Sequence, residues 1–299
     1  SWGLPVSSWG MTGAGPPSAS EMTGRPLSAT IDLSWATHAS TGSGVSALMV
    51  RSTADPAVEA WVAQLKSIVA DSGLPVISDA LGGPAPIIPQ LDTGSPQLNA
   101  AAQSVVRITG NAFACGVSQS GTGFVVADDR VVTNAHVVAG VTEPVVEAPN
   151  GEAIAGSIVY FDPVLDLAII AVPGLTADPL PLGGSLPAGT DAAVQGYPFG
   201  GPFTSGAARV MQVGTAQVDD IYGTSTHPRE VYTLAADVRQ GNSGGPVLTL
   251  DGTVAGVVFA RSADTASVGF AMTMAELDPV AAEASTLTAT VSSGDCISD

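Results

Sequence analysis

The sequence predicts an all-β fold made of two antiparallel barrels, and three observations lead to this prediction. The chain has 299 residues and 45% hydrophobic content, enough for a large core. Beyond residue 99, short apolar runs rich in valine and isoleucine recur, as expected of strands. Turn-forming pairs separate them at regular intervals: Asn150-Gly151, Pro173-Gly174, Gly183-Gly184 and Asp251-Gly252. This punctuation is typical of antiparallel barrels rather than of βαβ units.

Three segments are expected before the barrels. Residues 1–54 are rich in Ser, Thr, Gly and Pro and show no helical or strand period, so we expect little order there and assign no role to His38. Residues 55–73 carry apolar side chains at helical spacing, which predicts one amphipathic helix. Residues 74–98 contain many prolines and glycines, which is typical of an extended linker.

The folded domain is expected over residues 99–299. We place the first barrel at about 99–184 and the second at about 185–272. A C-terminal helix and tail should occupy 273–299, because Thr273-Met274-Ala275-Glu276 has the pattern of a helix-starting capping box.

Composition narrows the choice of partners. The 27 acidic residues against nine Lys and Arg give a formal charge of -18, which repels nucleic acid and anionic lipid, so we expect neither as a partner. No uninterrupted apolar stretch is long enough to span a membrane. No metal site or cofactor is predicted. Protonation of carboxylates toward the sequence pI of about 4.1 would relieve their repulsion, which suggests a domain that tolerates acid.

The most informative stretch is Gln240-Gly241-Asn242-Ser243-Gly244-Gly245-Pro246. Three glycines and a proline around one serine, between apolar runs, predict a tight turn that presents a hydroxyl. Such a hydroxyl becomes a nucleophile when a neighbouring base takes its proton and backbone N–H groups receive the developing negative charge. We expect Gly241 and Ser243 to supply those N–H groups.

The base is predicted from the order of the histidines. The chain has three, His38, His136 and His227, and none follows Ser243, which excludes an α/β-hydrolase. His136 ends a β-branched run, and Asp166 precedes an apolar strand. The order His, Asp, Ser is that of the chymotrypsin-like double barrel. Asp162 is the alternative acid, but it precedes a proline and looks like a turn former.

Three motifs carry a resemblance. Thr133-Asn134-Ala135-His136, Asp166-Leu167-Ala168 and Gly241-Asn242-Ser243-Gly244-Gly245-Pro246 resemble the trypsin-like serine proteases of the bacterial HtrA group. Within that group the likeness is to a membrane-anchored actinobacterial branch linked with acid resistance, and it covers roughly residues 99 to 299.

The resemblance implies a serine endopeptidase that acts on envelope or periplasmic proteins, with a role in acid or oxidative stress resistance. It places the protein in the periplasm or cell envelope, with a membrane anchor upstream of this chain; secretion is the alternative. We expect a monomeric protease domain with protein or peptide substrates. A non-catalytic protein-binding module on the same fold and an esterase remain as alternatives.

Three further expectations concern single residues. Asp237 lies six residues before Ser243, the spacing of the acid at the base of the specificity pocket in trypsins. There it would favour Arg or Lys at the cleavage site; the alternative is a structural bond within its own loop. Asn242 stands where digestive trypsins have an aspartate that ion-pairs with the N-terminus made by proteolytic cleavage. An amide cannot form this ion pair, so activity should not depend on such a cleavage. Cys115 and Cys296 are expected to form a disulfide that fixes the C-terminal tail, although a free buried thiol is the alternative.

Overall fold

The computed structural model describes residues 76–77, 85–114 and 116–297. These residues belong to one compact unit, Gln64–Asp299. The predictions for residues 1–54, for the helix over 55–73 and for Cys115 lie outside the described residues.

The first barrel is a seven-stranded sheet in which all neighbours are antiparallel, in the order β6-β5-β2-β3-β4-β8-β7. Its strands are β2 (Val105–Ala112), β3 (Val117–Ala127), β4 (Arg130–Thr133), β5 (Val145–Glu147), β6 (Ala153–Ala155), β7 (Ser157–Asp162) and β8 (Leu167–Ala171). All residues of β8 are buried. The strand is therefore buried on both faces. Ala168 and Ile170 belong to the core cluster of the first barrel, with valines and isoleucines of β2, β3, β4, β5 and β7, whereas Leu167 and Ile169 belong to a second cluster that also includes residues of the second barrel.

The second barrel contains β1 (Val76–Ile77), β9 (Asp191–Gly196), β10 (Thr204–Asp219), β11 (Thr226–Ala236), β12 (Pro246–Leu248), β13 (Val254–Ser262) and β14 (Val268–Thr273). The order is β1-β13-β12-β9-β10-β11-β14, and β13 also pairs with β14. That pairing closes six antiparallel strands into a ring. Strand β1, from the stretch predicted to be a linker, adds to β13 in parallel.

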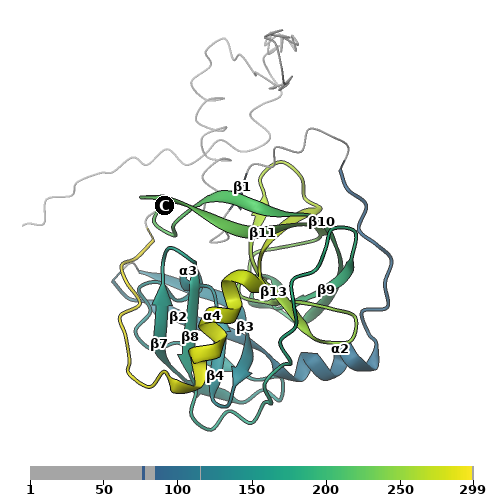
Figure 1. Cartoon of the computed structure of the whole chain (residues 1–299). Coiled ribbons are helices and arrows are strands. Elements are labelled where there is room, and N and C mark those ends of the chain that lie inside the picture. The colour runs from purple at the N-terminus through teal and green to yellow at the C-terminus, as the bar shows by residue number, and fades with distance from the viewer. Residues whose placement is uncertain (1–75, 78–84, 115, 298–299) are drawn as a thin grey trace, which may run out of the picture. The chain divides into compact units, whose positions relative to one another are not determined.

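The helices are short and lie outside the barrels. They are α2 (Pro96–Ala101), the 3-10 helix η2 (Ala102–Ser104), α3 (Ala135–Val138), the 3-10 helix η3 (Pro198–Gly200), α4 (Met274–Glu283) and the 3-10 helix η4 (Ala284–Thr286). Figure 1 shows the teal first sheet, the green second sheet and the yellow helix α4 after the last strand. The prediction of an all-β double barrel with a C-terminal helix is confirmed.

The start of α4 differs in detail from the predicted capping box. The hydroxyl of Thr273 accepts a hydrogen bond from the N–H of Ala275, as an N-cap residue should. Glu276, however, does not return to Thr273; its Oε1 accepts from the N–H of Glu230 at 2.8 Å. The carboxylate thus ties α4 to β11.

The hairpin of β10 and β11 connects the two barrels. It belongs to the second barrel, yet the N–H of Ile221 at its tip donates to the carbonyl of Pro163, in the turn between β7 and β8 of the first barrel, at 3.0 Å. Deeper in the hairpin, Arg229 donates to the carbonyl of Leu165 in the same turn at 3.0 Å. The hairpin therefore supports the turn that carries Asp166.

Candidate active site

The structure brings His136 and Asp166 together. His136 lies in α3, directly after β4, and Asp166 lies in the turn between β7 and β8. Nδ1 of His136 donates to Oδ2 of Asp166 at 2.8 Å and lies 3.0 Å from Oδ1, and the backbone N–H of His136 donates to Oδ1 at 2.9 Å. Both side chains are almost fully buried, at 4% and 3% exposure. With the proton held on Nδ1, Nε2 of the neutral ring is the free acceptor.

The backbone of the Asp166 turn is held in an unusual conformation. Asp166 has a backbone φ of 57°, in the left-handed region that residues other than glycine rarely adopt. Its carbonyl accepts a hydrogen bond from the side-chain amide of Asn134 at 2.8 Å. Asp162 instead accepts from the N–H groups of Val164 and Leu165 and so forms the turn itself. The acid that reaches His136 is therefore Asp166.

Ser243 lies in the turn between β11 and β12 and is 3% exposed. A Cβ added to Gly244 would lie 3.0 Å from the backbone nitrogen of Asn134 and 2.2 Å from the carbonyl oxygen of Thr122. The missing side chain therefore lets the serine turn approach the segment that leads into His136. The hydroxyl of Ser243 and Nε2 of His136 are both buried and have no hydrogen-bond partner among the described residues.

Thr122 of β3 links these segments, although no sequence pattern singled it out. It is fully buried, and its N–H donates to the carbonyl of Ser243 at 2.9 Å. Its hydroxyl donates to the carbonyl of Gly241 at 2.6 Å and accepts from the N–H of Tyr197 at 3.0 Å. One strand of the first barrel thus fixes the serine turn of the second. Its neighbours in the sequence, Ser120, Gly121 and Gly123, do not mark it as a structural residue.

Two backbone donors beside Ser243 are unpaired. Neither the N–H of Gly241 nor that of Ser243 has an acceptor in the described part of the chain. Gly241 has φ of 90°, and an added Cβ would lie 2.3 Å from the carbonyl of Tyr197, so only glycine fits. The N–H of Phe199 donates to the carbonyl of Gln240 at 2.6 Å. Because C=O and N–H point in opposite directions in a trans peptide, this bond turns the Gly241 N–H away from Phe199.

The other predicted residues are placed as follows. Asp237 is exposed and forms an ion pair with Arg239, two positions along the same loop, at 2.9 Å. Asn242 is buried, and its side-chain oxygen accepts from the N–H of Arg239 at 2.9 Å. No free cysteine occurs among the described residues, and because Cys115 is not one of them, its pairing with Cys296 stays a prediction.

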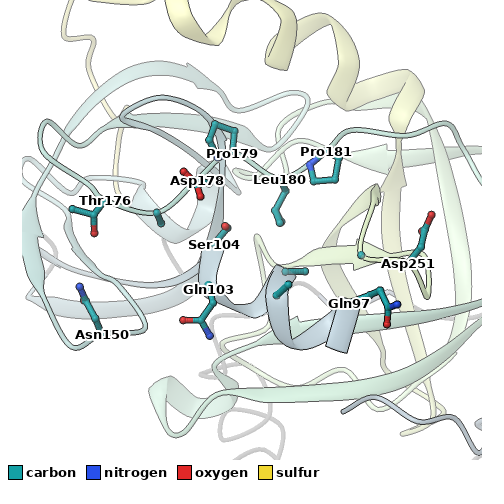
Figure 2. A pocket seen from close by; sticks show the side chains of 14 residues that line it. Gln97, Gln103, Ser104, Asn150, Thr176, Asp178, Pro179, Leu180, Pro181 and Asp251 are labelled. Carbon is teal, nitrogen blue, oxygen red and sulfur yellow. The ribbon is translucent and has the colours of Figure 1, made fainter. Parts of the chain in front are cut away.

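A separate cavity of about 620 Å³ lies away from these residues. Figure 2 shows Gln103 and Ser104, Asp178 and Asp251 around it, from three different segments of the chain. None of the predicted site residues lines it. Within residues 76–77, 85–114 and 116–297 there is no cluster of three or more metal-ligating side chains, and no helix is long and apolar enough to cross a membrane.

The chain is similar to known serine proteases. The family model described as a trypsin-like peptidase domain matches residues 121–257. Serine protease Rv3671c (MarP) of Mycobacterium tuberculosis is 40% identical over 245 residues, which are 79% of this chain and 60% of that protein. A probable periplasmic serine endoprotease, DegP-like, of Halomonas elongata is 34% identical over 164 residues, 51% of this chain and 32% of that protein.

A solved structure extends the likeness to three dimensions. The active form of the Rv3671c protease from M. tuberculosis superposes with a TM-score of 0.67 at 39% identity. The match covers 75% of this chain and all of that chain. The same two-barrel fold is therefore present over the described domain, whereas the chain spans about 60% of the length of the curated relatives it matches.

Proposed function

Because the chain belongs to the trypsin-like serine proteases, we propose that it is an endopeptidase with Ser243, His136 and Asp166 as its triad. One observation carries the proposal. The buried carboxylate of Asp166 holds Nδ1 of His136, while Nε2 and the Ser243 hydroxyl stay without partners in the described structure.

In the proposed reaction each of these groups has one role. The Ser243 oxygen attacks the scissile carbonyl carbon and its proton passes to Nε2 of His136. The negative charge on the carbonyl oxygen meets the N–H groups of Gly241 and Ser243. His136 then gives its proton to the leaving amine, which leaves an acyl-enzyme. Water, deprotonated by His136, hydrolyses the ester and restores the serine. Asp166 orients the ring and stabilises the imidazolium formed in each half-reaction.

The substrates we propose are proteins of the cell envelope or periplasm, because the DegP-like relative is a probable periplasmic endoprotease. A role in acid or oxidative stress resistance, an anchor outside this chain and a monomeric protease domain complete the proposal. Asp237 is a weaker candidate for a specificity pocket, because its carboxylate is exposed and already paired with Arg239. We therefore expect only a modest preference for Arg or Lys at the cleavage site.

A fluorophosphonate probe tests the proposal. It should label the wild-type chain on Ser243 and leave Ser243→Ala unlabelled, whereas a protein-binding module would react in neither. Comparison of casein with a p-nitrophenyl ester then separates a protease from an esterase. Peptides released from envelope proteins by the wild type and not by Ser243→Ala would identify the substrates. Equal labelling of Ser243→Ala would contradict the assignment of the nucleophile.

A further inference from the structure

A buried arginine lies behind the Asp166 turn. Arg229 of β11 is 2% exposed. Its Nη1 donates to the carbonyl of Leu165 at 3.0 Å, and its Nη2 donates to the carbonyl of Asp219 at 2.8 Å. The guanidinium carbon lies 5.3 Å from the ring centroid of Phe259 on β13, within the range of a cation–π contact. The guanidinium is thus fixed between the second barrel and the residue that precedes Asp166.

The charge of Arg229 is held close to carboxylates. Burial lowers the pKa of Arg229 below its ordinary value, and among the carboxylates that oppose this change Asp166 contributes most. The others are Glu276 of α4, Asp162 of β7 and Asp219 of β10. A guanidinium remains protonated throughout the pH range of enzyme activity. Arg229 is therefore a permanent positive charge that interacts with Asp166, and the same carboxylate contacts the ring of His136.

Stability alone does not account for this arginine. Nε of Arg229 is buried without a partner among the described residues, and an unpaired buried donor costs about 1–3 kcal/mol. Replacement of buried ionic groups by apolar side chains of similar volume is often neutral or stabilising. A methionine in this place would keep most of the apolar contact with Phe259. What it could not supply is the donor to Leu165 and the positive charge.

We propose that Arg229 is a positioning residue for Asp166. Its hydrogen bond to the Leu165 carbonyl holds the turn in which Asp166 adopts a positive φ. Its charge interacts favourably with the Asp166 carboxylate, and this is the electrostatic part of the role. The inference rests on the proposed function, because it gives Arg229 a part in orienting the triad across the barrel boundary.

Three variants of the full chain test the two parts of the role. Arg229→Met removes the charge and both hydrogen bonds, whereas Arg229→Lys keeps the charge and loses the two-pronged geometry. Arg209→Met is the matched control, because Arg209 is an exposed arginine of β10 paired with Asp191 and its loss changes the net charge equally. The measurement is the pH profile of kcat and kcat/KM on a p-nitrophenyl ester, with Tm for each variant.

In Arg229→Met we expect kcat to fall about 100-fold and the acidic limb of kcat/KM to move to higher pH by about 0.5–1 unit, because Arg229 favours the negatively charged pair of Asp166 with neutral His136. Arg229→Lys should keep the wild-type limb and lose about 10-fold in kcat with KM unchanged. Arg209→Met should match the wild type in both. If the acidic limb of kcat/KM in Arg229→Met stays at the wild-type pH, the electrostatic part of the proposed role is overturned.

The failure of this inference is distinguishable from that of the proposed function. If Ser243→Ala keeps its activity, the triad itself is wrong. If Ser243→Ala is inactive while Arg229→Met and Arg229→Lys both match the wild type, only the role of Arg229 is wrong. Should Arg229→Met fail to fold, Arg229→Lys decides: full kcat overturns the positioning role, and a 10-fold lower kcat at unchanged KM and Tm supports it.

Discussion

The turn that carries Asp166 and the turn that carries Ser243 are held by different means. At the first, side chains make the contacts: the Asp166 carboxylate meets the ring of His136, and the side-chain amide of Asn134 donates to the Asp166 carbonyl. At the second, the backbone is fixed by Thr122 and by close glycine contacts, while the serine hydroxyl has no partner in the described structure. The difference suggests that an acid–base pair must be oriented in advance, whereas a nucleophile must remain able to rotate.

The largest effect should come from the fixed side chain. Asp166→Asn should lower kcat by about 10,000-fold with little change in Tm, because an amide leaves His136 in the wrong tautomer. The matched variant Asp162→Asn should stay within about 3-fold of the wild type, since its oxygen can still accept the turn's N–H groups. Ester hydrolysis and thermal melts measure both. Similar losses in the two variants would contradict the assignment of the acid.

The next effect tests the fixed backbone. Gly244→Ala should destabilise the domain by about 3 kcal/mol, because Gly244 has φ of 80° and the new Cβ would lie 2.2 Å from the Thr122 carbonyl. Gly214→Ala is the control, because no atom lies within 4 Å of a Cβ built there. Its change should be within about 0.5 kcal/mol. Urea unfolding measures both, and equal stability of the two variants would show that the close approach is not required.

A smaller loss is expected from the residue that joins the two barrels. Thr122→Val removes the hydroxyl that serves Gly241 and Tyr197, so about 2 kcal/mol of stability should be lost. The exposed Thr226 bonds Asp219 at the hairpin end, and Thr226→Val should cost about 0.5 kcal/mol or less. Chemical denaturation compares the pair. A Thr122→Val chain as stable as the wild type would remove Thr122 as the link.

The smallest effect concerns the hairpin tip behind the acid turn. The hydroxyl of Ser225, with further donors in the same loop, holds the pKa of Asp220 well below its ordinary 3.8. A carboxyl group whose pKa is lower in the folded than in the unfolded chain stabilises the fold at pH values above its unfolded-state pKa. This contribution decreases as the pH falls below that value. The Tm difference between wild type and Asp220→Asn should therefore be constant from pH 7 to 5 and shrink below about pH 4. A difference that already shrinks between pH 7 and 5 would contradict it.

The fold was predictable from local patterns. Apolar runs and turn pairs predicted two antiparallel barrels, and the capping pattern at Thr273 predicted α4; both are present. The family was predictable because three separate motifs, around His136, Asp166 and Ser243, occur in the order found in trypsin-like proteases. The His136–Asp166 contact agrees with the prediction, while the catalytic roles of the triad and of Gly241 stay predictions.

What the sequence could not predict are contacts between distant positions. Thr122 and Arg229 resemble any other polar residue of a strand, and their importance arises only when the barrels meet. The ion pair of Asp237 with Arg239 also depends on side-chain direction, which the six-residue spacing to Ser243 does not define. Glu276 was expected to cap its own helix and instead serves β11, because a neighbouring strand offered a free N–H.

The hydrogen bond from the Thr122 N–H to the Ser243 carbonyl has a mechanical consequence. It joins the backbone of Ser243, in the second barrel, to that of Thr122, in the first. A motion that separates the two barrels must break this bond and displace Ser243. We therefore expect the proposed turnover to be lost together with the contact between the two barrels.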